Sequence, residues 1–195
     1  MTKLLVVDLC GTVVRVNTTH GFMRAASLSL LRRVAARVML SRGFSFLTHR
    51  WWPQLQRKAL IVCLRGLPRF DLLRQAEEYA RNALSLYARV EVLQRIKTAQ
   101  HEGVRVVLAS ASLDFIVEGF AKALLVEPAV STRLLYRTDD RCVGRIAVDS
   151  TGRKLVLLSE YIESSEFEFE VITDNVEDVD LMEAATSIWF IDNVN

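Results

Sequence analysis

The sequence predicts an α/β protein in which a parallel sheet carries a long helical insertion. From residue 104 onward, short apolar runs alternate with segments of helical periodicity, which is the pattern of a parallel sheet with crossover helices. Before residue 88, a single apolar run at the N-terminus is followed only by helical patterns. A chain of 195 residues is long enough for one such domain with an insertion and a substantial hydrophobic core.

The first predicted strand covers residues 3–7, because the apolar run KLLVV ends at once in Asp-Leu-Cys-Gly-Thr. A helical region follows. Over residues 22–40, apolar residues recur every four positions and arginines occupy much of the remaining surface, which predicts one amphipathic helix. Asp71 is placed to cap a later helix. The helices predicted before residue 104 cover residues 22–40, 51–64, 71–87 and 90–100.

The second half of the chain alternates between strands and helices. VRVVLA at residues 104–109 predicts a buried strand, and FEFEVIT at residues 167–173 predicts a strand that becomes fully apolar toward its end. An Asp139-Asp140 turn separates two further strands. The strands predicted in this half cover residues 104–109, 129–136, 142–148, 167–173 and 187–191, and the helices cover residues 113–125, 154–162 and 179–185.

The predicted division of the chain is a core of residues 1–14 and 88–195, interrupted by a helical insertion of residues 15–87. Charge divides in a similar way. The net charge is only +2, but residues 15–105 contain 17 Lys and Arg against 5 Asp and Glu, and residues 17–70 contain ten basic residues and no carboxylate. Segments of opposite charge usually have different functions, so the insertion and the core are expected to differ in what they bind.

The composition excludes several classes of protein. Hydrophobic residues make up 51% and charged residues 25%, which is typical of a globular protein and not of a disordered chain. The three cysteines are too few and too scattered for a disulfide framework or a zinc cluster. The N-terminal apolar run is too short for a secretory signal, and no stretch of about 18 apolar residues predicts a membrane span. The expectation is a reduced, cytoplasmic protein.

Three of the predicted apolar strands end in polar residues, at the edge where the functional groups of open parallel sheets collect. A lysine at the start of a later helix and a second acidic residue complete the set, which is Asp8, Ser110, Lys154, Asp174 and Asp178. One carboxylate can act as a nucleophile and another can hold Mg²⁺, while a serine and a lysine can hold phosphoryl oxygens. The set therefore suits phosphoryl transfer.

In this order the residues resemble the four motifs of the haloacid dehalogenase (HAD) superfamily, chiefly its phosphoserine-phosphatase-like branch. Asp8-Leu-Cys-Gly-Thr12 resembles the DxDGT motif and Asp174-Asn-Val-Glu-Asp178 the DxxxD motif, while Ser110 and Lys154 resemble the second and third motifs. The resemblance covers nearly the whole chain. It implies a HAD-type, Rossmann-like parallel sheet, and it identifies the insertion of residues 15–87 as a helical cap, because this branch carries its cap just after the first motif.

The resemblance also implies an Mg²⁺-dependent phosphatase. Asp8 is expected to attack phosphorus and to form an aspartyl-phosphate that water then hydrolyses. Asp8, the main-chain carbonyl of Cys10 and Asp174 are expected to bind Mg²⁺, with Asp178 in the inner or the outer coordination sphere. The phosphoryl group is expected to be bound by residues of the first three motifs, namely Gly11, Thr12, Ser110 and Lys154.

Cys10 departs from the family pattern, because it stands where DxDGT has its general acid/base. A thiol with a pKa of about 8.5 donates a proton less readily at neutral pH than a carboxylic acid does, and such proton transfer is worth about 10²- to 10⁴-fold in rate. Cys10 either takes part in catalysis or merely fills a tight loop, and His20 is either a replacement acid or an ordinary residue. The DxCGT loop followed by Asn17-Thr18-Thr19 also resembles phosphatases encoded with bacterial surface-polysaccharide genes.

Two functions therefore stay open. The first is a phosphatase that acts on a small phosphorylated metabolite, such as a sugar phosphate or a lipid-linked phosphate. The second is a catalytically weak or silent protein of the same fold that binds a phosphate ligand, a membrane surface or a protein partner through its basic insertion. Cys10 favours the second function, whereas the retained nucleophile favours the first, because a binding protein has no need of one.

The basic insertion has three interpretations. It is a solvated face, or it attracts an anionic phosphorylated substrate, or it lies against anionic lipid as a peripheral membrane contact. Arginine-rich helices that also carry Phe44, Phe46, Trp51 and Trp52 fit the third interpretation. Nucleic acid is not expected as a partner, because the sequence contains no recognised nucleic-acid-binding motif.

Overall fold

The computed structural model of the protein describes residues 2–41, 43–44, 55–162 and 167–192. These residues contain a six-stranded sheet with the order β4-β3-β2-β1-β5-β6. All neighbouring strands run parallel except β3 and β4, which are antiparallel. The strands are β1 (Thr2–Val7), β2 (Arg105–Leu113), β3 (Glu127–Tyr136), β4 (Cys142–Val148), β5 (Phe167–Thr173) and β6 (Ser187–Phe190). The predicted α/β fold class is confirmed.

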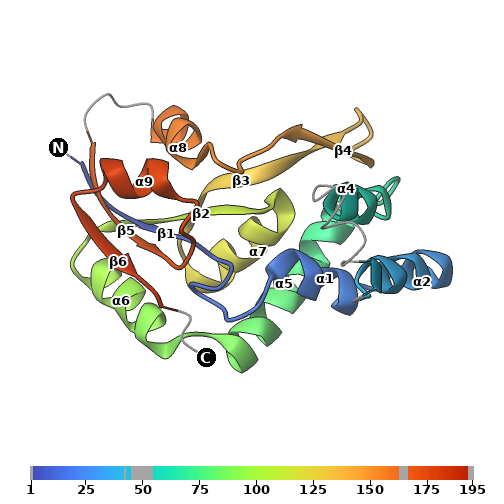
Figure 1. Cartoon of the computed structure of the whole chain (residues 1–195), viewed down its shortest axis with the longest axis horizontal. Coiled ribbons are helices and arrows are strands. Elements are labelled where there is room, and N and C mark those ends of the chain that lie inside the picture. The colour runs from blue at the N-terminus through green and yellow to red at the C-terminus, as the bar shows by residue number, and fades with distance from the viewer. Residues whose placement is uncertain (1, 42, 45–54, 163–166, 193–195) are drawn as a thin grey trace.

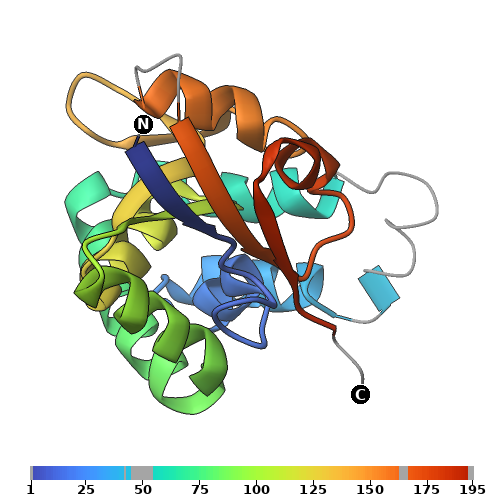
Figure 2. The ribbon, with the colours of Figure 1, turned by 90° about the vertical axis from the view of Figure 1, so that its left-hand side faces the viewer.

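Helices cover both faces of this sheet (Figures 1 and 2). Alternate residues of each strand point to opposite faces, so β1 sends Leu4 and Val6 into one core and Leu5 and Val7 into the other. The first core contains leucines of α8 (Lys154–Ile162) and α9 (Val179–Ala184), and the second contains residues of α6 (Val90–His101) and α7 (Asp114–Leu124). A strand buried on both faces reads as a continuous apolar run, which is why KLLVV and VRVVLA were recognisable.

The segment between β1 and α6 is helical where it is described. Its helices are α1 (Thr18–Ala25), α2 (Leu30–Met39), α4 (Leu55–Val62) and α5 (Arg69–Tyr87). The long helix α5 packs closely along α7, because Gly119 of α7 has no side chain to separate it from the backbone of Ala76. Helices α1, α2 and α4 lie beyond the carboxyl ends of the parallel strands (Figure 1). That residues 15–87 act as a cap stays a prediction.

The prediction of one continuous helix over residues 22–40 is wrong. The backbone is extended at Ala26 (φ −60°, ψ 140°), and the next helix begins only at Leu30. The Ser27 N–H donates to the Gln75 side chain at 2.7 Å, and Leu28 is buried between the two helices. The four-residue recurrence of apolar side chains spans the break, although these side chains are buried before it and exposed after it. Periodicity alone does not register such a break.

Smaller differences affect element ends. Helix α5 has Pro68 as its N-cap and carries Asp71 in its first turn, so the predicted cap is wrong by three residues. Residues 51–54 of the helix predicted at 51–64 lie outside the described residues, and α4 accounts for the remainder from Leu55. Among the described residues, no helix combines the length and the apolar character that crossing a membrane requires.

The strand order reverses at β1, which places the site. β1 pairs with β2 on one side, where Val7 is opposite Leu108, and with β5 on the other, where Val7 is opposite Ile172. The chain leaves β1 toward β2 and β3 and later returns to β5. In open α/β sheets, ligands bind outside the carboxyl ends of the strands at such a reversal. Asp8 is the residue that follows β1 at this point.

Candidate active site

A cavity of about 480 Å³ lies at the carboxyl ends of the central strands. Its lining includes five of the residues predicted to form the site, which are Asp8, Cys10, Ser110, Lys154 and Asp174. They come from β1, β2, the start of α8 and the end of β5, so segments far apart in the sequence meet here. Their predicted roles in catalysis and binding stay predictions, but the predicted juxtaposition is what the structure shows.

Ser110 lies within strand β2 and not in the loop that was expected to follow it. β2 continues to Leu113 instead of ending at Ala109, so Ser110 is inside the strand and not after it. The last residue of β2 that pairs with β1 is Leu108, however, and Ser110 therefore still projects beyond the edge of the central pair. Its main-chain carbonyl accepts a hydrogen bond from Ser150 Oγ at 3.0 Å, which ties β2 to the loop before α8.

Lys154 lies between two carboxylates in a buried cluster. Its Nζ is 3.1 Å from Asp8 Oδ1 and 2.7 Å from Asp178 Oδ2. Burial by itself lowers the pKa of Lys154, but the charges of Asp8 and Asp178 outweigh burial and raise that pKa above its ordinary value. Burial raises the pKa of Asp8, the ammonium opposes this effect, and Asp178 adds to it. The ammonium is therefore charged and fixed beside the carboxylate predicted to be the nucleophile.

Asp178 does not line the cavity but holds Lys154 from behind. Its Oδ2 accepts hydrogen bonds from Lys154 Nζ and, at 2.8 Å, from Thr173 Oγ1, while its Oδ1 accepts from Asn175 Nδ2 at 3.3 Å. These contacts use both carboxylate oxygens. The structure thus gives Asp178 a positioning role toward Lys154, and its predicted place in a metal coordination sphere stays a prediction.

Gly11 and Thr12 support Asp174. Thr12 Oγ1 donates to Asp174 Oδ1 at 2.8 Å and accepts from the Asp174 N–H at 2.9 Å. Gly11 has φ +77°, and a Cβ there would lie 1.9 Å from Asp174 Oδ2, so only glycine allows the two loops to approach this closely. Neither residue lines the cavity. Their predicted contact with substrate stays a prediction, whereas their effect on Asp174 is direct.

The donor set of the cavity fits a hard divalent cation. Asp8 Oδ1 is buried and, although it pairs with the ammonium, receives no hydrogen bond. Asp8 and Asp174 at the cavity and Asp178 behind it surround the ammonium of Lys154, while Arg57 is paired with Asp149. No three His, Cys, Asp or Glu side chains of the described residues gather as metal ligands. Asp8 and Asp174 would thus supply the side-chain ligands for Mg²⁺, which usually keeps several waters, and the Cys10 carbonyl would supply a third protein ligand.

The Cys10 thiol is held in a small polar network. Its Sγ is hydrogen-bonded to Thr18 Oγ1 at 2.9 Å and to Ser112 Oγ at 3.0 Å, and the two hydroxyl groups are bonded to each other. Burial, and then the charge of Asp8, raises the pKa of Cys10. The thiol is therefore protonated at neutral pH and is no thiolate nucleophile. Neither Thr18 nor Ser112 was assigned from the sequence.

His20 lines the same cavity from the first turn of α1. Its N–H donates to the side chain of the N-cap residue Asn17 at 2.9 Å, which fixes this turn at the cavity wall. Burial lowers the pKa of His20, and the nearby charge of Arg24 lowers it further. The imidazole is consequently neutral at pH 7, so it is better suited to accept a proton from water than to donate one to a leaving group.

The comparison with protein families decides the identity of the fold. The sequence-family model of the haloacid dehalogenase-like hydrolases matches residues 5–183 of the chain. The protein belongs to this family. The predicted membership of the HAD superfamily is thereby confirmed, while the roles of the individual motif residues stay predictions.

Solved structures share the fold of this HAD protein. A protein of unknown function from Bordetella pertussis Tohama I matches with a TM-score of 0.78 and 21% identity, covering 96% of this chain and 89% of that one. A phosphoserine phosphatase, captured as a phospho-aspartyl intermediate analogue, matches with a TM-score of 0.57 and 17% identity, covering 96% of this chain and 85% of that one. Cytosolic 5'-nucleotidase IIIB bound to cytidine matches with a TM-score of 0.61 and 15% identity, covering 96% of this chain and 71% of that one. A search of curated proteins found no match.

Arg57 is the HAD site residue that sequence reasoning missed most clearly. It belongs to α4 and lines the cavity, and its side chain reaches residues of the predicted domain of residues 1–14 and 88–195. Its guanidinium donates to Asp149 at 3.0 Å, to Thr132 Oγ1 at 2.6 Å and to Thr151 Oγ1 at 3.0 Å. It also donates at 2.9 Å to the carbonyl of Ala111, the residue after Ser110. An arginine in a carboxylate-free segment requires a partner elsewhere, but the sequence offers no means to choose Arg57 among the nine arginines of residues 17–70.

Replacing Arg57 by Met should raise KM by about fivefold, with a smaller change in kcat. The hydrogen bonds of Arg57 hold α4 against the end of β2, which contains Ser110, and against the loop before α8, which begins at Lys154. Partly exposed ion pairs are worth roughly 1 kcal/mol. The matched control is Lys58→Met, which removes an exposed charge from the same helix. Steady-state kinetics with thermal unfolding of both variants checks this prediction. The same KM in both variants would show that Arg57 does not hold the helix in place.

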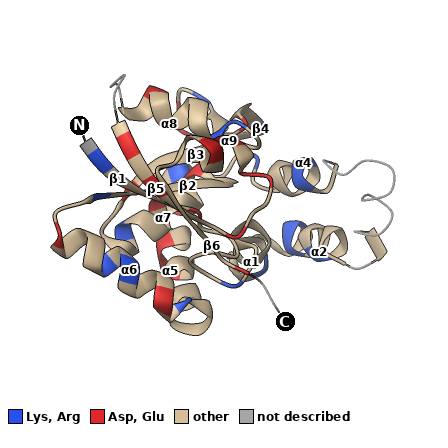
Figure 3. Cartoon of the chain, turned by 60° about the vertical axis from the view of Figure 1, so that its left-hand side comes forward, with Lys and Arg blue, Asp and Glu red and all other residues tan. Residues whose placement is uncertain are grey.

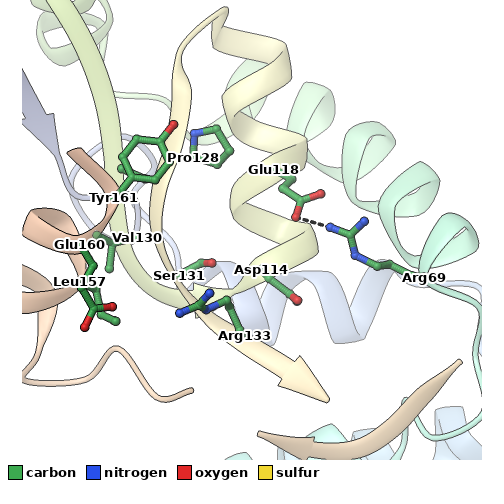
Figure 4. A pocket seen from close by; sticks show the side chains of 11 residues that line it. Arg69, Asp114, Glu118, Pro128, Val130, Ser131, Arg133, Leu157, Glu160 and Tyr161 are labelled. Atoms are coloured by element: carbon green, nitrogen blue, oxygen red, sulfur yellow. Dashed lines mark hydrogen bonds and ion pairs between the residues drawn. The ribbon is translucent and has the colours of Figure 1, made fainter. Parts of the chain in front are cut away.

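A second cavity, of about 460 Å³, lies between α7, β3 and α8 (Figure 4). Three of its charged groups, Arg69, Asp114 and Glu118, have partners within the protein. Asp114 accepts from the Phe115 N–H at 2.9 Å and from Tyr136 Oη at 3.3 Å, and Glu118 forms an ion pair with Arg69. None of the residues predicted to carry catalysis lines this cavity. We therefore assign the chemistry to the cavity at Asp8.

Proposed function

We propose that this HAD hydrolase is an Mg²⁺-dependent phosphatase that acts on a small phosphorylated metabolite through an aspartyl-phosphate. The observation that carries the proposal is the buried pair of Asp8 and Lys154, 3.1 Å apart, in a cavity that Ser110 and Asp174 also line. A module that only binds phosphate needs the ammonium but not a carboxylate beside it, because that carboxylate repels the ligand. The fold shared with a phosphoserine phosphatase and a nucleotidase supports the same conclusion.

In the first step, a carboxylate oxygen of Asp8 attacks phosphorus and the bond to the leaving oxygen breaks. Lys154 favours this step because its fixed ammonium neutralises phosphoryl oxygens as they approach the carboxylate. Ser110 provides a hydroxyl at the same edge of the sheet for a further phosphoryl oxygen. Mg²⁺, when bound at Asp8 and Asp174, would supply additional charge neutralisation. The departing alkoxide requires a proton.

In the second step, water attacks phosphorus and the bond between phosphorus and Asp8 breaks, which regenerates the free carboxylate. This water has to lose a proton, and the neutral imidazole of His20 is the described group in the cavity best suited to accept it. The Cys10 thiol is already hydrogen-bonded to Thr18 and Ser112, and its raised pKa makes it a poor proton donor. Base catalysis is therefore better provided for in this site than acid catalysis.

A role in surface-polysaccharide biosynthesis is the narrower part of the proposal. It rests on the DxCGT loop followed by Asn17-Thr18-Thr19. Cys10 Sγ contacts Thr18 Oγ1 at 2.9 Å, so the two parts of that sequence pattern belong to one network in space. Asn17 and Thr19 both line the cavity as well, which supports a role of this segment in choosing the substrate.

Phosphomonoesters ordered by leaving-group pKa test the proposal. With Mg²⁺ present, acyl and aryl phosphates should be hydrolysed readily and alkyl phosphates slowly, because only the poor leaving groups need a proton from the enzyme. Binding of inorganic phosphate without hydrolysis of any ester would instead favour the silent binding protein.

The variant Cys10→Asp places a carboxylic acid at the position of the thiol and should change this series selectively. Turnover of an alkyl phosphate should rise by up to about 10²-fold, while that of an aryl phosphate should change far less. The controls are the single variants Cys63→Ser and Cys142→Ser, at two cysteines that do not line the cavity, and thermal unfolding checks that each variant keeps its structure. An identical dependence on leaving-group pKa in wild type and Cys10→Asp would show that the missing proton does not matter at this position.

A further inference from the structure

Helix α2 presents an apolar stripe to solvent. Leu30, Leu31, Val34 and Val38 are exposed by 75%, 84%, 51% and 56%. Leu30, Val34 and Val38 are four residues apart and share one face of the helix, and Leu31 extends that face. Ala36, on the opposite side, is buried. The helix therefore has a packed side and an outer apolar side that is exposed to solvent and that none of the described residues covers.

Arginines lie directly beside this stripe. Arg33 and Arg37 precede Val34 and Val38 in the sequence, and both are exposed. Together with Arg24 of α1 they line a cleft of about 360 Å³ whose remaining lining residues, as far as the structure describes them, are Met23 and Leu40. A cleft lined by three guanidinium groups and no carboxylate suits a phosphate group.

The surrounding charge has one sign. Helices α1, α2 and α4 carry Lys and Arg but no Asp or Glu (Figure 3). The whole stretch of residues 17–70 lacks a carboxylate. A merely solvated face explains the arginines but not the apolar stripe, since the outer side of a solvated helix is normally polar. The combination of both is typical of a helix that lies in a membrane interface.

Charge also discriminates among the occupants that could cover this face. A second copy of the chain in a two-fold dimer would bring the same arginines against each other with no carboxylate between them. Nucleic acid would satisfy the arginines but would leave the leucine and valine side chains in water. An anionic lipid surface offers phosphate groups at the level of the arginines and apolar material beneath them.

We propose that α2 docks the protein on an anionic lipid surface, with a lipid phosphate in the cleft of Arg24, Arg33 and Arg37 and the side chains of Leu30, Val34 and Val38 at the acyl boundary. This docking goes beyond the proposed phosphatase activity and does not depend on it. All residues of this docking surface lie in α1 and α2, whereas Phe46, Trp51 and Trp52 lie outside the described residues.

The test is cosedimentation with vesicles of phosphatidylcholine containing phosphatidylglycerol, compared with vesicles of phosphatidylcholine alone. The full-length protein should bind the anionic vesicles and should release partly as salt is added, because exposed charges are screened over about 8 Å at physiological ionic strength. Binding that is equal on both vesicle types, or absent from both, would overturn the proposal.

Two variants separate the stripe from the cleft. The triple variant Leu30→Ser/Val34→Ser/Val38→Ser removes the apolar contact with lipid. The double variant Arg33→Glu/Arg37→Glu reverses the charge of the cleft. Each variant should weaken binding to anionic vesicles by on the order of tenfold or more. The charge control is Arg74→Glu/Arg81→Glu on α5, which changes net charge equally at exposed positions. The apolar control is Val90→Ser/Leu135→Ser/Val156→Ser, also at exposed residues.

Several outcomes would contradict the docking surface. Equal losses in test and control variants would mean that binding follows net charge or general hydrophobicity. A concentration-dependent dimer that the stripe variant abolishes, without vesicle binding by the wild type, would assign the face to a second copy. Hydrolysis of a soluble aryl phosphate should be unchanged in all four variants. Since vesicle binding is measured without turnover, failure of the docking and failure of the phosphatase proposal are distinguishable.

Discussion

The variant Asp8→Asn is expected to lose turnover by a factor of at least about 10³, as enzymes do when their nucleophile is removed. An amide oxygen does not form the covalent bond to phosphorus that the first step requires. The fold should survive, because Asn has nearly the same shape and Lys154 keeps its 2.7 Å contact to Asp178. Steady-state hydrolysis of an aryl phosphate and thermal unfolding measure the two effects.

A trapping experiment distinguishes loss of the nucleophile from a general loss of activity. Beryllium trifluoride mimics an aspartyl-phosphate, so it should bind the wild type and protect it against thermal unfolding but should have no effect on Asp8→Asn. The matched control is Asp139→Asn, which makes the same chemical change at an exposed carboxylate outside the cavity. Near-native turnover of Asp8→Asn would show that Asp8 is not the nucleophile, whatever the outcome of the other predictions.

Replacing each of the two aspartates of the fourth motif, Asp174 and Asp178, by alanine should affect activity and stability differently. Asp174 lines the cavity, so Asp174→Ala should cost more activity than Asp178→Ala and should shift the Mg²⁺ requirement to higher concentration. Asp178→Ala leaves the buried ammonium of Lys154 with one carboxylate instead of two. Breaking a buried pair costs about 3–5 kcal/mol, and each kcal/mol lowers Tm by about 2–4 °C in a chain of this size.

Parallel measurements of kcat, Mg²⁺ dependence and Tm separate these effects. Asp178→Asn is the matched variant, because its amide oxygen can still accept from Thr173 Oγ1 while the charge is lost. It should fall between the wild type and Asp178→Ala in Tm. Equal activity with and without a chelator would exclude the metal from the mechanism. A wild-type Tm for Asp178→Ala would show that Asp8 alone suffices to hold Lys154.

The central part of the site could be predicted from the sequence because backbone topology determines it. Residues that follow buried parallel strands reach one edge of the sheet whatever their side chains are, so Asp8 and Asp174 could be placed together by counting strands. Lys154 could be placed only by its resemblance to the third motif, because α8 follows the antiparallel strand β4 and strand counting alone does not bring its start to this edge. In these cases a local pattern was enough to give a position in space.

The supporting residues could not be predicted, because their roles depend on side-chain packing between distant segments. The DxxxD spacing suggested that Asp178 faces a cation, but spacing does not show that Thr173 and Asn175 turn its carboxylate toward Lys154. Likewise, nothing in the sequence pairs Arg57 with Asp149, 92 positions later. The break at Ala26 could not be predicted either, because apolar side chains recur every four residues on both sides of it and their spacing does not give the direction of the chain.

The position of β1 in the middle of the sheet has a consequence for biosynthesis. β1 is the first strand made, yet its partners β2 and β5 begin only at residues 105 and 167. Asp8 leaves the ribosome long before Lys154 and Asp178, the groups that fix it. A nascent chain therefore has no assembled site until most of its length has emerged, and its apolar first strand has to stay unpaired meanwhile. Such non-local pairing slows folding and exposes the strand to aggregation, so the N-terminal strand is the segment that a chaperone would protect during synthesis.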